Sequence, residues 1–300
     1  MATTAPDWWK ATCGALGVGL AVLSLPVGSA AAEGSGAVPV ASEWTREQAS
    51  RVRLIAGVAQ PAGEPAGKLY AGLEIELDEG WKTYWRNPGS SGVPPRIVFD
   101  GSENLARAEL LFPAPVRFKD PDGDTIGYKT HVVLPIALTP KDASKPIVLK
   151  AAAEFGLCRE ICVPVQPELG LTVLPNVGKV TETGPLQAAL DRVPRPAPAH
   201  PDAPRLEQVA PRLTGDTPQV VIEARFPGRA EAGDIFLEAP DGLWMPLPQA
   251  SGTTENGARR FVVDLTDGAD VGDLKGRRIR VTLVGSDSQS ETEFHMVEAK

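Results

Sequence analysis

The amino-acid sequence predicts an all-β protein with two sandwich domains, the second smaller than the first. Apolar and polar residues alternate over short runs, most clearly at residues 69–77, where Glu74 and Glu76 interrupt a series of aliphatic side chains. This period-two alternation is typical of strands that are buried on one face. The 300 residues also include 30 glycines and 29 prolines, which supply turns between the runs. Short runs at intervals of about 8–15 residues, separated by such turns, favour a β-sandwich.

The order of these patterns divides the chain into domains. In the first domain, the expected strands are residues 52–58, 69–77, 81–86, 96–99, 106–112, 131–138, 146–153 and 170–174. In the second, they are residues 219–226, 234–238, 243–247, 259–265, 277–284 and 291–297. A short helix is expected at residues 183–193, and alternating prolines at residues 194–201 favour an extended segment. The prediction is therefore a first domain at 51–180, a helix and Pro-rich linker at 181–204, and a second domain at 205–300, to which the sequence assigns no chemistry.

Residues 1–32 have the pattern of a secretory signal peptide. Lys10 precedes an apolar run that ends in small residues, which predicts cleavage near Ala32. A retained membrane anchor is the alternative, because the run is about 20 residues long. The polar residues that follow favour cleavage, and residues 33–50 are expected to form a flexible lead. No later stretch is apolar enough to span a bilayer, so we expect an exported protein that does not span the membrane once the signal is removed.

Composition excludes several classes of function. The formal net charge is −8, which argues against a nucleic-acid partner because phosphate contacts require a basic surface. The chain has only three cysteines and three histidines, too few for several metal sites. Cys13 would leave with the signal peptide, so the exported chain would keep Cys158 and Cys162 as its only cysteines.

Cys158 and Cys162 are the main candidates for chemistry. Residues four apart on a turn lie close enough for a disulfide, and a bridge that closes so small a loop stabilises a fold less than one that closes a long loop. Three interpretations remain open: a structural clip, a Cu(I) site completed by His131 or a methionine, and reversible thiol–disulfide exchange. Exchange is favoured, since so tight a bridge is easily strained, and strained or exposed bridges are the ones that exchange. The candidate methionines, Met245 and Met296, lie in the other predicted domain.

A polar loop at residues 119–127 is the candidate shield for these thiols. Asp120, Asp122 and Asp124 alternate in it, as acidic ligands do in a calcium loop. The twelfth position from Asp120 is His131, however, where an EF-hand requires glutamate. An ordinary acidic turn is therefore the preferred interpretation.

Several motifs together carry a resemblance to a known family. They are Gly-Trp-Lys-Thr-Tyr-Trp-Arg at 80–86, Phe-Pro-Ala-Pro at 112–115, Gly-Tyr-Lys-Thr at 127–130 leading into the run at 131–136, and the cysteine segment at 156–164. In this order they resemble the N-terminal periplasmic domain of the DsbD family of thiol–disulfide interchange proteins. They also resemble the related ScsB-type proteins linked to copper tolerance. The resemblance covers about residues 50–175, and extends more weakly to the second domain.

The resemblance implies a periplasmic, immunoglobulin-like sandwich whose cysteines relay electrons without a cofactor. The donor would be a membrane protein of the CcdA or DsbD type, supplied as a separate partner because this chain has no electron-conducting membrane segment. The clients would be exported thioredoxin-like proteins or disulfide isomerases, including those of cytochrome c maturation. A copper-binding or copper-tolerance factor using the same thiols, and a partner-binding scaffold without catalysis, are the alternatives.

The resemblance also assigns roles to particular residues. Residues 121–126 would form a cap over the cysteines, with Pro121, Asp122 and Asp124 in it. Tyr84 and Trp85 match family aromatics on the neighbouring strand, with core packing as the alternative role. In the family the second cysteine usually accepts the attack of the client, which favours Cys162.

Overall fold

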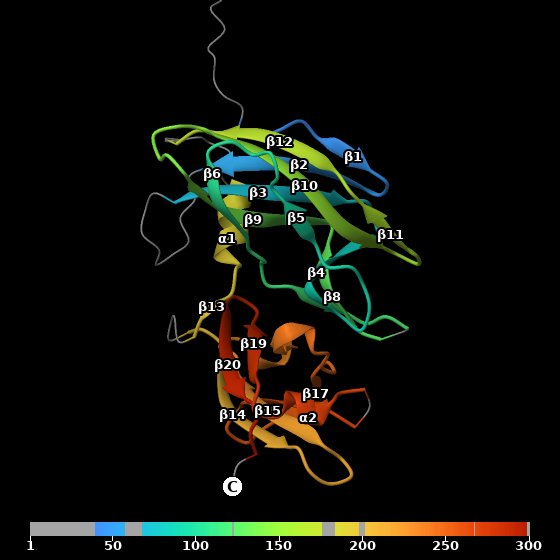
Figure 1. Ribbon diagram of the computed structural model, residues 1–300. Coiled ribbons are helices and arrows are strands. Elements are labelled where there is room, and N and C mark those ends of the chain that lie inside the picture. The colour runs from blue at the N-terminus through green and yellow to red at the C-terminus, as the bar shows by residue number, and fades with distance from the viewer. Residues whose placement is uncertain are drawn as a thin grey trace, which may run out of the picture. The chain divides into compact units, whose positions relative to one another are not determined.

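The computed structural model confirms the all-β fold with two sandwiches (Figure 1). It describes residues 40–57, 68–121, 123–175, 184–197, 202–266 and 268–298. The predicted signal peptide at 1–32, and the first residues of the predicted lead, lie outside this part of the chain. No helix among the described residues is long and apolar enough to cross a membrane.

Two sheets form the first sandwich. One has the order β1 (Thr45–Glu47), β2 (Ser50–Gly57), β3 (Leu69–Leu77), β9 (His131–Pro140), β6 (Leu105–Leu110). The other has the order β11 (Cys162–Val165), β10 (Ile147–Cys158), β4 (Lys82–Gly89), β8 (Thr125–Lys129), β7 (Val116–Phe118), and β12 (Glu168–Val173) and β5 (Arg96–Val98) also pair with β10. Their inward side chains form one core, in which Leu54, Leu73, Ile136 and Phe155 are fully buried.

Strand β3 differs from its prediction because its second face is covered too. The helix α1 (Gly184–Asp191) packs there through Leu186 and Leu190. A Cβ on Gly72 would lie 2.7 Å from a Val133 methyl carbon, so the outer face is tightly packed at this point. Glu74, predicted to face solvent, is buried, and Arg53 and His131 both contact its carboxylate. The alternation of side chains in β3 predicts one buried face and one exposed face. The helix that covers the second face lies more than a hundred residues later in the chain, so the local pattern does not reveal it.

The second sandwich also has two sheets. One has the order β13 (Arg195–Pro196), β20 (Gln289–His295), β19 (Arg278–Val284), β16 (Asp234–Glu238). The other has the order β14 (Arg205–Arg212), β15 (Gln219–Arg225), β18 (Arg259–Asp264), β17 (Gln249–Thr253), and the short helix α2 (Val271–Leu274) closes onto the core. The core is separate from that of the first sandwich and includes Phe261 and Ile279.

Three sequence predictions are corrected by these elements. The lead at 33–50 is not wholly flexible, because Thr45–Glu47 pair with β2 and Trp44 stacks on Arg51. The predicted strand at 243–247 is absent and strand β17 follows it; Pro246 and Pro248 lack the N–H groups that a strand ladder needs. Part of the predicted linker, Arg195–Pro196, pairs with β20 and belongs to the second sandwich.

The two sandwiches are joined through strand β16, an edge strand of the second. The Phe236 ring lies 5.7 Å from the Trp85 ring and is buried in the core of the first sandwich. Asn87 Nδ2 donates to the Leu237 carbonyl at 2.9 Å, and the Arg86 guanidinium pairs with Glu238 at 2.7 Å. An edge strand exposes unpaired backbone groups, so this contact also covers part of a surface that would otherwise be prone to association.

Candidate functional site

Strands β10 and β11 are neighbours in one sheet (Figure 1). The two cysteines lie opposite each other where β10 ends and β11 begins. They form a disulfide, with Cα atoms 4.2 Å apart. Arg159, Glu160 and Ile161 make the turn between them, closed by a hydrogen bond from the Arg159 N–H to the Ile161 carbonyl at 3.2 Å. The bridge therefore links two directly paired residues of a hairpin, and it encloses only the turn.

The two sulfurs have different surroundings. Cys158 is only 2% exposed, whereas Cys162 is exposed to solvent. Ile161, beside Cys162, is also exposed, so the rim of the hairpin presents an apolar side chain next to the accessible sulfur. An incoming thiolate or disulfide can therefore approach Cys162, while Cys158 is placed to react within the molecule.

Tyr84 on β4 is brought directly to the disulfide. Its hydroxyl donates to Cys158 Sγ at 2.7 Å and lies 3.2 Å from Cys162 Sγ. Burial raises the pKa of Tyr84, and the negative charge of Asp120 raises it further, so the phenol stays protonated and remains a donor. Glycines make room for the ring: a Cβ on Gly92, which has φ +124°, would lie 2.4 Å from it.

Trp85 points to the opposite face of the same strand. It is 0% exposed, packs on Phe236, and Arg86 stacks on it at 4.5 Å. Its indole Nε1 has no hydrogen-bond partner among the described residues. Adjacent residues of a strand alternate between faces, so only Tyr84 can reach the sulfurs. The two aromatics that were predicted together thus occupy different environments.

The predicted cap divides into a turn and a strand. Pro121 is exposed, Asp122 lies outside the described residues, and Asp124 pairs with both Arg117 and Lys119. Residues 125–126 begin strand β8 and are buried.

Asp120 also belongs to this site; the sequence placed it in the shielding loop at 119–127 but assigned it no partner. Its carboxylate pairs with Lys82 and accepts a hydrogen bond from the Thr125 hydroxyl at 2.5 Å. Lys82 lies opposite Cys158 in the β4–β10 ladder, so this pair is next to the buried sulfur. The sequence did offer a signal for Lys82: it lies in the Gly-Trp-Lys-Thr-Tyr-Trp-Arg motif two residues before Tyr84, so in a strand both side chains point to the same face.

The two acids of the turn that the structure describes, Asp120 and Asp124, are held ionised. Burial favours the neutral form of Asp120, but hydrogen bonds from Lys82 and Thr125 outweigh it and lower its pKa. For Asp124, burial is likewise outweighed by Lys119 and Arg117, which lower its pKa. These ion pairs are therefore complete at neutral pH, and their stabilisation is lost only as the pH falls through the depressed pKa values.

A cavity of about 600 Å³ lies beside Cys158. Trp81 and Phe118 line it, together with Lys82, Lys129 and Arg159. The Arg159 guanidinium lies 5.9 Å from the Trp81 ring, and among the described residues neither Arg159 nor Lys129 has a carboxylate partner. The cavity next to the disulfide is thus lined by aromatic rings and cationic side chains, and also by the acidic residues Asp78, Glu79 and Asp120.

A metal site gains no support from these positions. His131 Nε2 lies 2.9 Å from Glu74 Oε1, and Met245 and Met296 are buried in the second sandwich. The described residues contain no group of three or more His, Cys, Asp or Glu side chains that could hold a metal ion. In the acidic turn, for which a calcium loop was the less favoured interpretation, the described acids Asp120 and Asp124 are engaged by cationic side chains.

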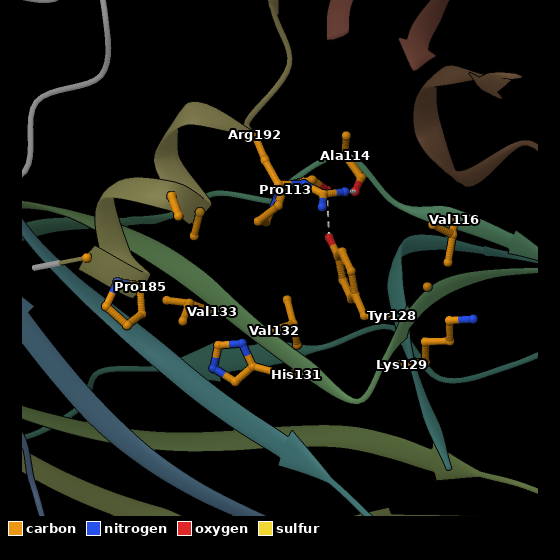
Figure 2. Close-up of a pocket in the computed structure, with 14 residues that line it drawn as sticks. Pro113, Ala114, Val116, Tyr128, Lys129, His131, Val132, Val133, Pro185 and Arg192 are labelled. Carbon is orange, nitrogen blue, oxygen red and sulfur yellow. Dashed lines mark hydrogen bonds between the residues drawn. The ribbon is translucent and has the colours of Figure 1, made fainter. Parts of the chain in front are cut away.

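A second cavity, of about 620 Å³, lies between α1 and strands β8 and β9 (Figure 2). Tyr128 forms part of its wall and donates to the Pro113 carbonyl at 2.8 Å, while His131 and Arg192 lie at its edges. Neither cysteine lines it. It is therefore separate from the disulfide site.

Comparison with known proteins identifies the sandwich that carries the disulfide. Residues 56–174 match the family model described as thiol:disulfide interchange protein DsbD, N-terminal. Those residues form a DsbD N-terminal domain. The crystal structure of the N-terminal periplasmic domain of ScsB from Proteus mirabilis superposes on this chain with a TM-score of 0.66 at 21% identity, and the match covers 87% of this chain and 99% of that one. No curated protein matches the chain.

The structural match extends the likeness beyond the DsbD N-terminal domain. Because it covers nearly nine-tenths of this chain, it includes residues of both sandwiches. The family model ends at residue 174, so the second sandwich is related to the ScsB structure by fold alone. The resemblance inferred from the motifs is confirmed.

Replacing Tyr84 by phenylalanine tests the phenol in this DsbD N-terminal domain. In the reduced protein, the hydroxyl can donate to a thiolate and so favour the charged form. A hydrogen bond to a charged group contributes about 1.5–3 kcal/mol, and about 1.4 kcal/mol corresponds to a tenfold change in equilibrium. We expect Tyr84→Phe to move the pH midpoint of thiol alkylation upward by about one unit. The measurement is the alkylation rate of the reduced protein across pH.

Tyr128→Phe is the matched control for this substitution. It removes a buried tyrosine hydroxyl that donates to a carbonyl and has no contact with sulfur. We expect it to lower thermal stability and leave the alkylation midpoint unchanged. Equal midpoints for Tyr84→Phe and the wild type would show that the phenol does not stabilise a thiolate.

Proposed function

We propose that this chain is a periplasmic thiol–disulfide exchange protein that relays electrons from a membrane donor to exported clients. The donor is a protein of the CcdA or DsbD type, and the clients are thioredoxin-like proteins or disulfide isomerases. The observation that carries the proposal is the disulfide with one exposed and one buried sulfur, contacted by a protonated phenol. The match of residues 56–174 to the thiol:disulfide interchange family supports the same chemistry.

The exchange proceeds in two substitutions at sulfur. In the reduced protein, the Cys162 thiolate attacks one sulfur of the client disulfide, forming a mixed disulfide and releasing one client thiolate. The Cys158 thiolate then attacks Cys162 Sγ, which forms the internal disulfide and releases the second client thiolate. Two electrons pass to the client, whose thiolates take up the two protons given up by Cys158 and Cys162. A dithiol of the donor restores the reduced form by the reverse sequence.

The cavity beside Cys158 supports a role in client contact. Trp81 and Phe118 line it, and so do Arg159 and Lys129, which lack carboxylate partners among the described residues. Of the acids that also line it, Asp78 and Asp120 are paired with Arg46 and Lys82, which leaves Glu79. A client that presents acidic side chains around its own disulfide would be steered to these cations.

The reduction potential of the full chain tests the proposal. We expect a midpoint of roughly −180 to −270 mV, the range of proteins that exchange disulfides. The measurement is thiol alkylation and mass shift across graded redox buffers, followed by electron transfer from the reduced chain to an oxidised disulfide isomerase. A midpoint below about −300 mV, with no transfer, would instead indicate a structural clip.

A further inference from the structure

Strand β4 connects the disulfide to the second sandwich through two adjacent residues. The Tyr84 hydroxyl contacts both sulfurs, and the Trp85 ring packs on Phe236 of strand β16. Neighbouring side chains of a strand point to opposite faces, but they are carried by the same stretch of backbone. A displacement of Trp85 therefore also displaces the Tyr84 hydroxyl.

Part of β4 is held by the second sandwich rather than by the ladder of its own sheet. The register of β4 with β8 runs from Lys82 to Tyr84, is interrupted there, and resumes at Gly89. Its pairs with β10 are at Lys82 and Thr83. Within the interruption, residues 85–87 contact strand β16 through a ring contact, an ion pair and a hydrogen bond. The second sandwich thus supports β4 directly after the residue that touches the sulfurs.

Phe236 belongs to the second sandwich but is buried in the first. Its neighbours Ile235 and Leu237 lie in the core of the second sandwich, whereas Phe236, on the opposite face of β16, is 1% exposed in the core of the first. Antiparallel pairing along the whole of β16 with β19 fixes its position. Leu247 and Val284 of the second sandwich pack against the same core. The core beneath the disulfide is therefore completed by side chains from the second sandwich.

We infer that Phe236 is a positioning residue through which the second sandwich fixes the Tyr84 hydroxyl at the sulfurs. Its ring supports Trp85, the indole sets the course of β4, and β4 directs the hydroxyl at Cys158 Sγ. Without the ring, a cavity remains beside the indole, and the surrounding structure relaxes partly into it. A hydrogen bond weakens steeply as its angle worsens, so this relaxation would weaken the bond to a thiolate. The inference rests on the proposed function of the disulfide and gives the second sandwich a role in tuning its reactivity.

Phe236→Ala in the full chain tests the inference through the pH dependence of iodoacetamide alkylation in the reduced protein. We expect the alkylation midpoint to move upward by about half a pH unit, a roughly threefold change that lies within the range for substitutions along coupled networks. The same substitution in the Tyr84→Phe chain should leave the midpoint unchanged, because the hydroxyl through which it acts is already absent. This double-mutant cycle isolates the coupling between the two residues.

Phe261→Ala is the matched control. It makes the same chemical change at a side chain that is also 1% exposed, but that lies in the core of the second sandwich and packs on Phe226. We expect it to lower the free energy of unfolding and to leave the alkylation midpoint unchanged. A wild-type midpoint for Phe236→Ala would overturn the inference, as would an equal shift in the Phe261→Ala protein or a shift that persists in the Tyr84→Phe chain.

Phe236→Leu keeps the test decisive if the alanine variant fails to fold. Leucine leaves an apolar side chain in the core but removes the ring from Trp85, so it must also raise the midpoint. The readout uses a small reagent and no client, so failure of the wild-type chain to exchange with clients would count against the proposed function alone. An unchanged midpoint in a folded Phe236 variant, or in Tyr84→Phe itself, would count against the role of Phe236.

Discussion

Replacement of either cysteine by alanine is expected to abolish turnover of a client disulfide, and the two variants should fail at different steps. Cys162→Ala removes the exposed sulfur, so no mixed disulfide should form with the client. Cys158→Ala removes the buried resolving sulfur, so the mixed disulfide at Cys162 should accumulate. The measurement is non-reducing electrophoresis with mass spectrometry after mixing each reduced variant with an oxidised thioredoxin-like client.

The control for these two variants is a measurement of their folding stability. The disulfide closes only a hairpin turn, and a short loop contributes little to stability in the chain-entropy model. Both variants should therefore keep a cooperative unfolding transition. Turnover at the wild-type rate by either single variant would refute the relay, and accumulation of mixed disulfide by Cys162→Ala would reverse the assigned roles.

Trp85→Ala should be the most destabilising substitution away from the disulfide. The indole is fully buried where the two sandwiches meet and contacts Phe236 of the second. Truncating a buried tryptophan to alanine typically costs about 3–5 kcal/mol, because lost burial and the remaining cavity both contribute. We expect a loss of this size in the free energy of unfolding. It is measured from the midpoint and slope of denaturant titrations.

Trp244→Ala is the matched control, since it makes the same chemical change at a side chain that is 49% exposed. Surface substitutions of this kind usually stay within about 0.5 kcal/mol. Similar losses for the two tryptophans would show that Trp85 does not act as a shared core residue. Retention of wild-type alkylation rates by the Trp85 variant would show that interface packing and thiol access are independent.

Strands were predictable where the side chains of a short segment by themselves favour a β-sheet. Residues 69–77 and 234–238 were expected as strands and appear as β3 and β16 with the same bounds, because their alternating or β-branched side chains suit a pleated sheet. The strand expected at 243–247 was wrong: Pro246 within it, and Pro248 directly after it, lack the N–H groups that a strand ladder needs. Strands β7 and β8 were missed because the polar connection between them has the composition of a loop.

The candidate site was predictable only in the features that depend on short stretches of sequence. Spacing placed Cys158 and Cys162 within reach of each other, and the resemblance placed Tyr84 and Trp85 on a neighbouring strand. Neither could show which aromatic faces the sulfurs, because that depends on which face of β4 meets β10. Asp120 was overlooked as a partner of Lys82 because the two residues are 38 positions apart.

By itself, the sequence determined the all-β architecture, the closeness of the two cysteines and the family of the first sandwich, since these follow from local periodicity, short spacing and motif order. Only the tertiary structure decided that Cys158 is buried and Cys162 exposed, that Tyr84 contacts sulfur while Trp85 enters the core, and that Asp234 reaches Arg117. These features depend on sheet register and on packing between segments distant along the chain. Such contacts are set by the whole fold, and no local pattern encodes them.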